Sequence, residues 1–180
     1  MRIVAGSWRG RALAAPKGEA TRPTADRVRQ ALFDMLLHAP WGGYDRVVGA
    51  TVLDAFAGTG ALGLEALSRG AAHAHFIERD RAALAVLRAN IATLGAAASV
   101  YPGDATRPPP GVPCGLVFLD PPYGQGLVEK ALDALSLAGW LAPGALVVAE
   151  TGREEALAPW GEVLAERGHG AARVTVMRSN

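Results

Sequence analysis

Short apolar runs recur along the chain from residue 47 onward, and segments with helical spacing separate most of them. The runs predict strands at 51–56, 73–77, 99–101, 116–119, 145–149, 163–165 and 173–177. The intervening spacing predicts helices at 61–68, 82–94 and 128–137. Because parallel neighbours need crossover helices, this alternation predicts an α/β fold with a doubly wound, mostly parallel, seven-stranded sheet.

The first forty residues show a different pattern. Residues 2–4 and 11–13 can pair as a short hairpin, and a helix is expected at 25–37. The apolar spacing of that helix predicts a buried side made of Val28, Ala31, Leu32, Met35 and Leu36.

Length and composition indicate one domain in a reducing compartment. With 180 residues, half of them apolar, the chain can bury one core, so we expect a single domain over 1–180 with a core at 47–180. The lone Cys114 excludes an internal disulfide, and we expect a cytoplasmic protein. The longest uncharged stretch, 134–149, is 16 residues long and interrupted by Gly and Pro, so no membrane span is expected.

Charge is distributed unevenly. Residues 1–30 carry seven basic and two acidic side chains, a balance of +5, while the whole chain has +1. A basic segment of this kind favours a polyanion-binding extension at 1–40, although a solvated charged face is the common alternative.

A glycine-rich loop follows the first predicted strand. Gly58, Gly60 and Gly63 satisfy the pattern G-x-G-x-x-G, which serves either the pyrophosphate of a dinucleotide or the sugar and methionine parts of S-adenosylmethionine.

Three acidic residues at strand ends favour the second ligand. Asp54 would repel a pyrophosphate but would pair with an ammonium group. Glu78 can accept hydrogen bonds from ribose hydroxyls, and Asp104 can accept one from an adenine amino group. The alternative for Asp54 and Asp104 is that they only cap turns.

The fourth predicted strand runs into Asp120, Pro121, Pro122 and Tyr123. The exocyclic amine of a purine is a weak nucleophile until a neighbouring group accepts a hydrogen bond from it, and the Asp120 carboxylate and Pro121 carbonyl can both accept. The two prolines fix the backbone, and the Tyr123 ring can stack on a base, which contributes about 1–3 kcal/mol. This box therefore predicts methylation of a base amine.

At this point the chain resembles the bacterial 16S ribosomal RNA guanine-N2 methyltransferases that modify the head of the small subunit. The likeness covers nearly the whole length and rests on the sequences at 1–6, 8–11, 21–29, 54–70 and 120–123. The first three stretches are the specific ones, since many nucleic-acid amino methyltransferases share the glycine loop and the box.

The resemblance implies a Rossmann-like class I methyltransferase with S-adenosylmethionine as cofactor and ribosomal RNA, free or within a small-subunit particle, as partner. We expect a monomer without a metal. The candidate cofactor residues are Asp54, Phe56, Gly58, Gly60, Glu78 and Asp104. The candidate catalytic residues are Asp120, Pro121, Pro122 and Tyr123, and the candidate RNA-binding residues are Arg9, Arg11, Arg22 and Arg27.

Three alternatives stay open: an adenine-N6 methyltransferase on DNA or RNA, an NAD-dependent reductase, and a noncatalytic RNA-binding module. His73 and His75 lie on the same face of one strand, but no third ligand with suitable spacing accompanies them, so no metal site is expected there.

Overall fold

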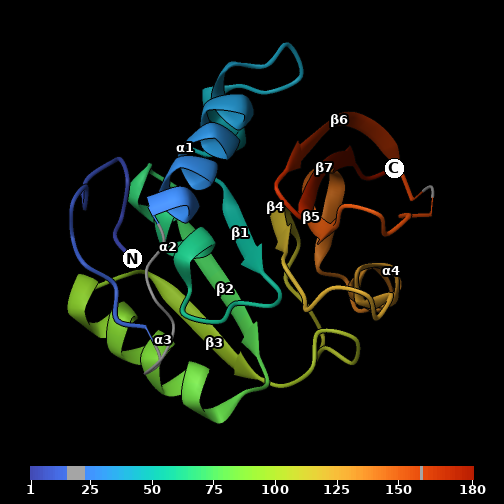
Figure 1. Ribbon diagram of the computed structural model, residues 1–180. Coiled ribbons are helices and arrows are strands. Elements are labelled where there is room, and N and C mark those ends of the chain that lie inside the picture. Colours follow the sequence, from blue (N-terminus) through green and yellow to red (C-terminus); the bar gives the residue numbers. More distant parts are fainter. Residues whose placement is uncertain (16–22, 159) are drawn as a thin grey trace.

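The computed structural model describes residues 1–15, 23–158 and 160–180, and a mixed sheet with helices on both faces dominates it (Figure 1). The described strands are β1 (Thr51–Asp54), β2 (His73–Glu78), β3 (Ala98–Pro102), β4 (Cys114–Leu119), β5 (Leu141–Gly152), β6 (Glu162–His169) and β7 (Ala172–Arg178). The described helices are α1 (Pro23–His38), α2 (Ala61–Ser68), α3 (Arg81–Leu94) and α4 (Leu127–Leu137), with a short 3-10 helix η1 (Tyr44–Arg46).

The sheet has the predicted topology. Its strand order is β3-β2-β1-β4-β5-β7-β6, and every pair from β3 across to β5 is parallel. Strand β7 runs antiparallel to both β5 and β6. The carboxyl ends of β1 to β5 therefore share one edge, and the order reverses between β1 and β4, where sheets of this kind bind ligands.

Every strand and helix predicted above is present in the described residues, and the ends differ by a few positions. The largest difference is β5, which extends well beyond the predicted 145–149. Pro143 and Gly144 lie where the pairing between β4 and β5 is irregular, and the strand continues past them.

Two apolar layers cover the faces of the sheet. Helices α1, α2 and α3 pack on one face, and α4 packs on the other (Figure 1). Leu36, Leu64 and Phe118 belong to the first layer, whereas Leu132 and Trp140 belong to the second, and all five are fully buried.

The predicted buried side of α1 is partly wrong. Leu32 and Leu36 are buried, but Ala31 is exposed, and Val28 and Met35 line a groove of about 340 Å³ beside β6 and β7. Two unpredicted side chains point inward instead. Phe33 packs on Phe118 with ring centroids 5.7 Å apart, and Arg29 pairs with a buried carboxylate of α2. These contacts determine which residues of α1 face the core, and apolar spacing alone could not show them.

The predicted N-terminal hairpin is present and docked. The Ile3 amide donates to the Arg11 carbonyl at 2.9 Å, and Arg2 and Ala12 form an antiparallel bridge. Ile3 and Leu13 are buried in the layer under α1 to α3. The hairpin is therefore part of the packed structure as well as a basic segment.

His73 and His75 have partners on the neighbouring strand. His73 Nε2 lies 2.9 Å from the Ser99 hydroxyl, and His75 Nδ1 lies 3.3 Å from the Tyr101 hydroxyl. His75 also packs edge-on against Trp140. Both rings therefore hold β2 to its surroundings.

In the part of the chain that the structure describes, no helix is both long and apolar enough to cross a membrane.

Candidate active site

One cavity of about 590 Å³ opens at the carboxyl edge of the sheet, where the strand order reverses. It brings together eight of the residues predicted from the sequence: Phe56, Gly58, Glu78, Asp104, Asp120, Pro121, Pro122 and Tyr123. Four different strand ends supply them, because parallel strands bring their carboxyl ends to the same edge.

In the glycine loop between β1 and α2, one glycine faces the cavity and another packs against the core. Gly58 has a φ of +52°, and a Cβ atom there would meet nothing within 4 Å, so the backbone lies open to a ligand. Gly60 has a φ of +84°, and its Cβ would lie 2.4 Å from the Leu87 side chain. Gly60 is therefore required by turn and packing, and its contact with a cofactor stays a prediction.

Glu78 closes this loop from the neighbouring strand. Its carboxylate accepts from the Gly58 amide at 2.7 Å and from the Asp80 amide at 2.7 Å. Asp80 in turn caps α3 by accepting from the Ala83 amide. Glu78, which was predicted to bind the ribose, therefore already fixes the neighbouring loop through its carboxylate.

Asp54 lies beneath the loop, with 2% of its surface exposed. It accepts from the Gly63 amide at 3.0 Å. Burial raises the pKa of Asp54 to about 7, the Gly63 hydrogen bond opposes this rise, and the charge of Glu78 adds to it. A cation placed beside Asp54 would favour its ionised form.

Asp104 caps a turn by accepting from the Thr106 amide at 2.9 Å and the Thr106 hydroxyl at 2.8 Å, and it also lines the cavity. These two hydrogen bonds, assisted by Arg79 at 3.7 Å, lower the pKa of Asp104. The hydrogen bond of Asp104 to an adenine amino group stays a prediction.

The Asp120 side chain follows β4 directly, is exposed and lines the cavity. Desolvation by the neighbouring protein atoms, together with the charges of Glu150 and Asp54, raises the pKa of Asp120 to about 7. Pro121 is buried, whereas 43% of Tyr123 is exposed. The box therefore presents an acceptor and an aromatic face on a rigid backbone.

Two glutamates near the box were missed in the sequence. The Tyr123 hydroxyl donates to Glu150 at the end of β5, and desolvation followed by this hydrogen bond raises the pKa of Tyr123. Glu155 accepts from the amides of Gly124, Gly126 and Gly152, so it joins the loop after the box to β5. Glu150 had a readable signal, because it ends an apolar strand as Asp54 and Asp120 do. Glu155 had none.

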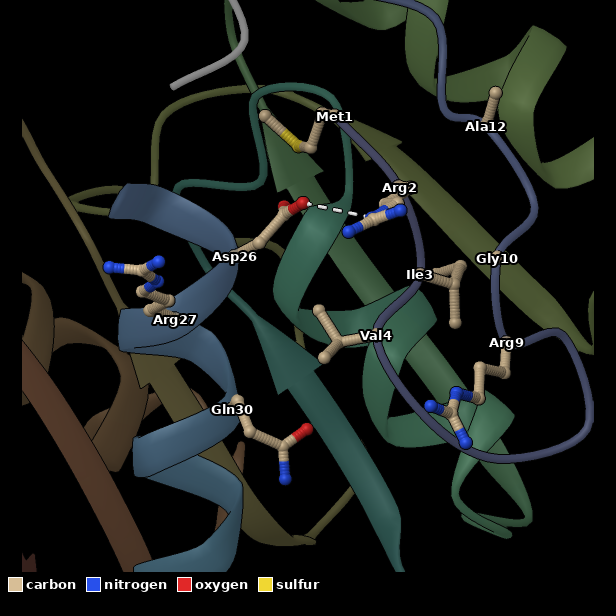
Figure 2. A pocket seen from close by; sticks show the side chains of 10 residues that line it. All are labelled: Met1, Arg2, Ile3, Val4, Arg9, Gly10, Ala12, Asp26, Arg27 and Gln30. Carbon is tan, nitrogen blue, oxygen red and sulfur yellow. Dashed lines mark ion pairs between the residues drawn. The ribbon is translucent and has the colours of Figure 1, made fainter. Parts of the chain in front are cut away.

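Two of the predicted RNA-binding residues, Arg9 and Arg27, line a second cavity. A groove of about 750 Å³ separates the hairpin from α1, and Figure 2 shows Arg9 and Arg27 on these two elements. Both side chains are exposed. Arg11 is also exposed and donates to the Thr93 carbonyl of α3 at 3.0 Å. Arg22 lies outside the described residues.

The net positive charge counted for residues 1–30 overstated the number of basic side chains that a polyanion can reach. Arg29 is only 5% exposed and contacts Asp26 at 2.8 Å and Glu65 at 3.4 Å. Arg2 also pairs with Asp26, at 3.4 Å (Figure 2). The helical position of Arg29 turns it inward, so it stabilises the fold instead of facing solvent.

Comparison with known proteins places the chain in a family. The family described as "conserved hypothetical protein 95" matches residues 1–178. Ribosomal RNA small subunit methyltransferase D of Escherichia coli is 47% identical over 160 residues, which are 87% of this chain and 77% of that protein. The protein of the same name from Haemophilus influenzae is 38% identical over 164 residues, 87% of this chain and 81% of its own length.

A solved structure from Escherichia coli, 40% identical in sequence, superposes with a TM-score of 0.85 and covers 100% of this chain and 98% of its own. This similarity confirms the predicted Rossmann-like fold, and the methyltransferase names of the relatives support S-adenosylmethionine as the cofactor. The chain therefore belongs to the conserved hypothetical protein 95 family and is similar to small-subunit ribosomal RNA methyltransferases, as its resemblance predicted.

Proposed function

We propose that this chain transfers a methyl group from S-adenosylmethionine to the exocyclic N2 of a guanine in 16S ribosomal RNA. The observation that carries the proposal is the cavity that joins the open Gly58 loop and two strand-end acids to the complete box at 120–123. The names of the relatives support a small-subunit RNA substrate. The choice of guanine N2 comes from the sequence resemblance.

The cavity fits the proposed cofactor. Gly58 leaves room for a close approach of ligand to backbone, and Phe56 offers an apolar wall. The buried Asp54 carboxyl, with its raised pKa, suits the ammonium of a methionine moiety. Glu78, Asp104 and Gly60 complete the proposed cofactor set. When bound, S-adenosylmethionine supplies an electrophilic methyl group on a sulfonium.

The box residues act on the target amine. The Asp120 carboxylate and Pro121 carbonyl accept hydrogen bonds from the amine, which frees its lone pair and orients it. In this proposal Asp120 also takes up the proton that the nitrogen loses. Pro122 keeps the turn rigid, and the exposed Tyr123 ring offers a stacking face for the base.

We further infer that residues 1–40 form the RNA-binding extension of a single domain whose core is 47–180. Arg9, Arg11, Arg22 and Arg27 are its proposed phosphate contacts. The enzyme acts as a monomer in the cytoplasm in this proposal, and needs no metal.

Product analysis tests the proposal. Purified protein is incubated with S-adenosylmethionine carrying a labelled methyl group and with 16S RNA or small subunits from a strain that lacks the enzyme. Digestion to nucleosides should yield labelled N2-methylguanosine, and an Asp120→Ala variant should yield almost none. Labelled N6-methyladenosine would establish the adenine alternative instead. Binding of NAD without binding of S-adenosylmethionine would exclude a methyltransferase.

A further inference from the structure

Glu150 is placed beside the proposed catalytic centre without a role in the mechanism above. Strands β4 and β5 are parallel and pair Leu119 with Ala149, so the next residues, Asp120 and Glu150, follow on adjacent strands. Adjacent strands lie about 4.8 Å apart. Glu150 is half-buried, and its charge is felt at both Asp120 and Tyr123.

The two oxygens of Glu150 differ in their surroundings. Oε1 accepts from the Tyr123 hydroxyl, whose ring lines the cavity. Among the described residues, none donates a hydrogen bond to Oε2, and no described Lys, Arg or His forms an ion pair with Glu150. One carboxylate oxygen near Asp120 therefore has no hydrogen-bond donor among the described residues.

Guanine and adenine differ at the atoms that such an oxygen would meet. The Watson–Crick edge of guanine carries two neighbouring donors, the N2 amine and N1–H. Adenine carries its N6 amine next to N1, which is an acceptor. Ionised carboxylates only accept hydrogen bonds, so two adjacent carboxylates complement the edge of guanine and oppose the N1 lone pair of adenine.

We propose that Glu150 accepts a hydrogen bond from N1–H of the target base and thereby selects guanine over adenine. The inference rests on the proposed N2 methylation, which assigns the amine to Asp120 and Pro121. Glu150 then reads the ring atom next to that amine. Its bond to Tyr123 fixes the carboxylate relative to the stacking ring, so both contacts to the base are set by one pair of side chains.

The test uses 2-aminopurine, which has the same exocyclic amine as guanine but an acceptor at N1. RNA carrying either base at the mapped target position is methylated by the wild type and by Glu150→Gln, and kcat/KM is measured for each. The wild type should prefer guanine. The Gln amide can donate to the N1 acceptor, so the guanine preference should fall by about 10- to 100-fold, as expected for a charge-assisted hydrogen bond.

Two controls separate base reading from a structural role. Tyr123→Phe removes the hydroxyl bonded to Glu150 but keeps the carboxylate, so it should slow the reaction and retain more of the guanine preference than Glu150→Gln does. Calorimetry with S-adenosylmethionine should give the same affinity for Glu150→Gln and wild type, which confirms that the variant is folded. If Glu150 only positions Tyr123, Gln still accepts from that hydroxyl and the preference stays at the wild-type value, which overturns the inference. Methylation of adenine N6 by the wild type would overturn the proposed function, and this inference with it.

Discussion

The carboxylate of Glu65 in α2 holds the N-terminal hairpin to the core, and its removal is a demanding test of the fold. The side chain is fully buried. It accepts from the Val4 amide at 2.8 Å and the Ala5 amide at 3.0 Å. It also pairs with Arg69 at 2.8 Å and Arg29 at 3.4 Å, and both guanidinium groups are less than a tenth exposed.

Glu65→Ala would leave two amides without an acceptor and the buried Arg69 without its counter-charge, while Arg29 keeps its pair with Asp26. Removing one member of a buried ion pair costs about 3–5 kcal/mol. The separate losses share partners and do not simply add, so we expect the free energy of unfolding to fall by about that amount. Domains of this kind have a total of about 5–15 kcal/mol. Glu65→Gln should lose less, because its amide oxygen can still accept from one of the two backbone amides.

Urea unfolding measures the change in free energy, and amide hydrogen exchange measures the local effect. The exchange of the Val4 and Ala5 amides should quicken in Glu65→Ala more than that of amides in the central strands. Glu162→Ala is the matched control, because Glu162 pairs with Arg178 at the surface and should lose at most about 1 kcal/mol. A Glu65→Ala protein within 1 kcal/mol of the wild type, with these two amides still protected, would refute the reasoning.

Three further predictions follow from the site. Asp54→Asn should weaken S-adenosylmethionine binding by about 1.5–3 kcal/mol in calorimetry, because a charge-assisted bond to the ammonium is lost; unchanged affinity would remove Asp54 from the cofactor site. The raised pKa of Asp120 predicts that kcat/KM increases as pH rises through about 7, since the ionised carboxyl is the stronger acceptor and can take up a proton from the amine, and a profile flat over this range would contradict that role. Arg9→Ala and Arg27→Ala should each flatten the dependence of log K on log salt by about 0.7 for single-stranded RNA, whereas an unchanged slope would make these residues a solvated face.

Much of the site followed from local sequence. An apolar run that ends in an acid marks the carboxyl end of a buried strand, and Asp54 and Asp120 were located in this way. Gly58 was located by the spacing of the glycine pattern. These features depend on neighbours along the chain and on the side-chain period of strands and helices, so no knowledge of packing was needed.

Packing decided the rest. The contact between Tyr123 and Glu150 joins residues 27 positions apart, and only the register of β4 and β5 brings them together. Arg29 appeared to be one more basic group facing solvent, but the docking of α1 turns it toward Glu65. Composition and periodicity describe what each segment prefers by itself. The partner of a buried charge or the free oxygen of a carboxylate depends on which segments meet, and only the tertiary structure determines that.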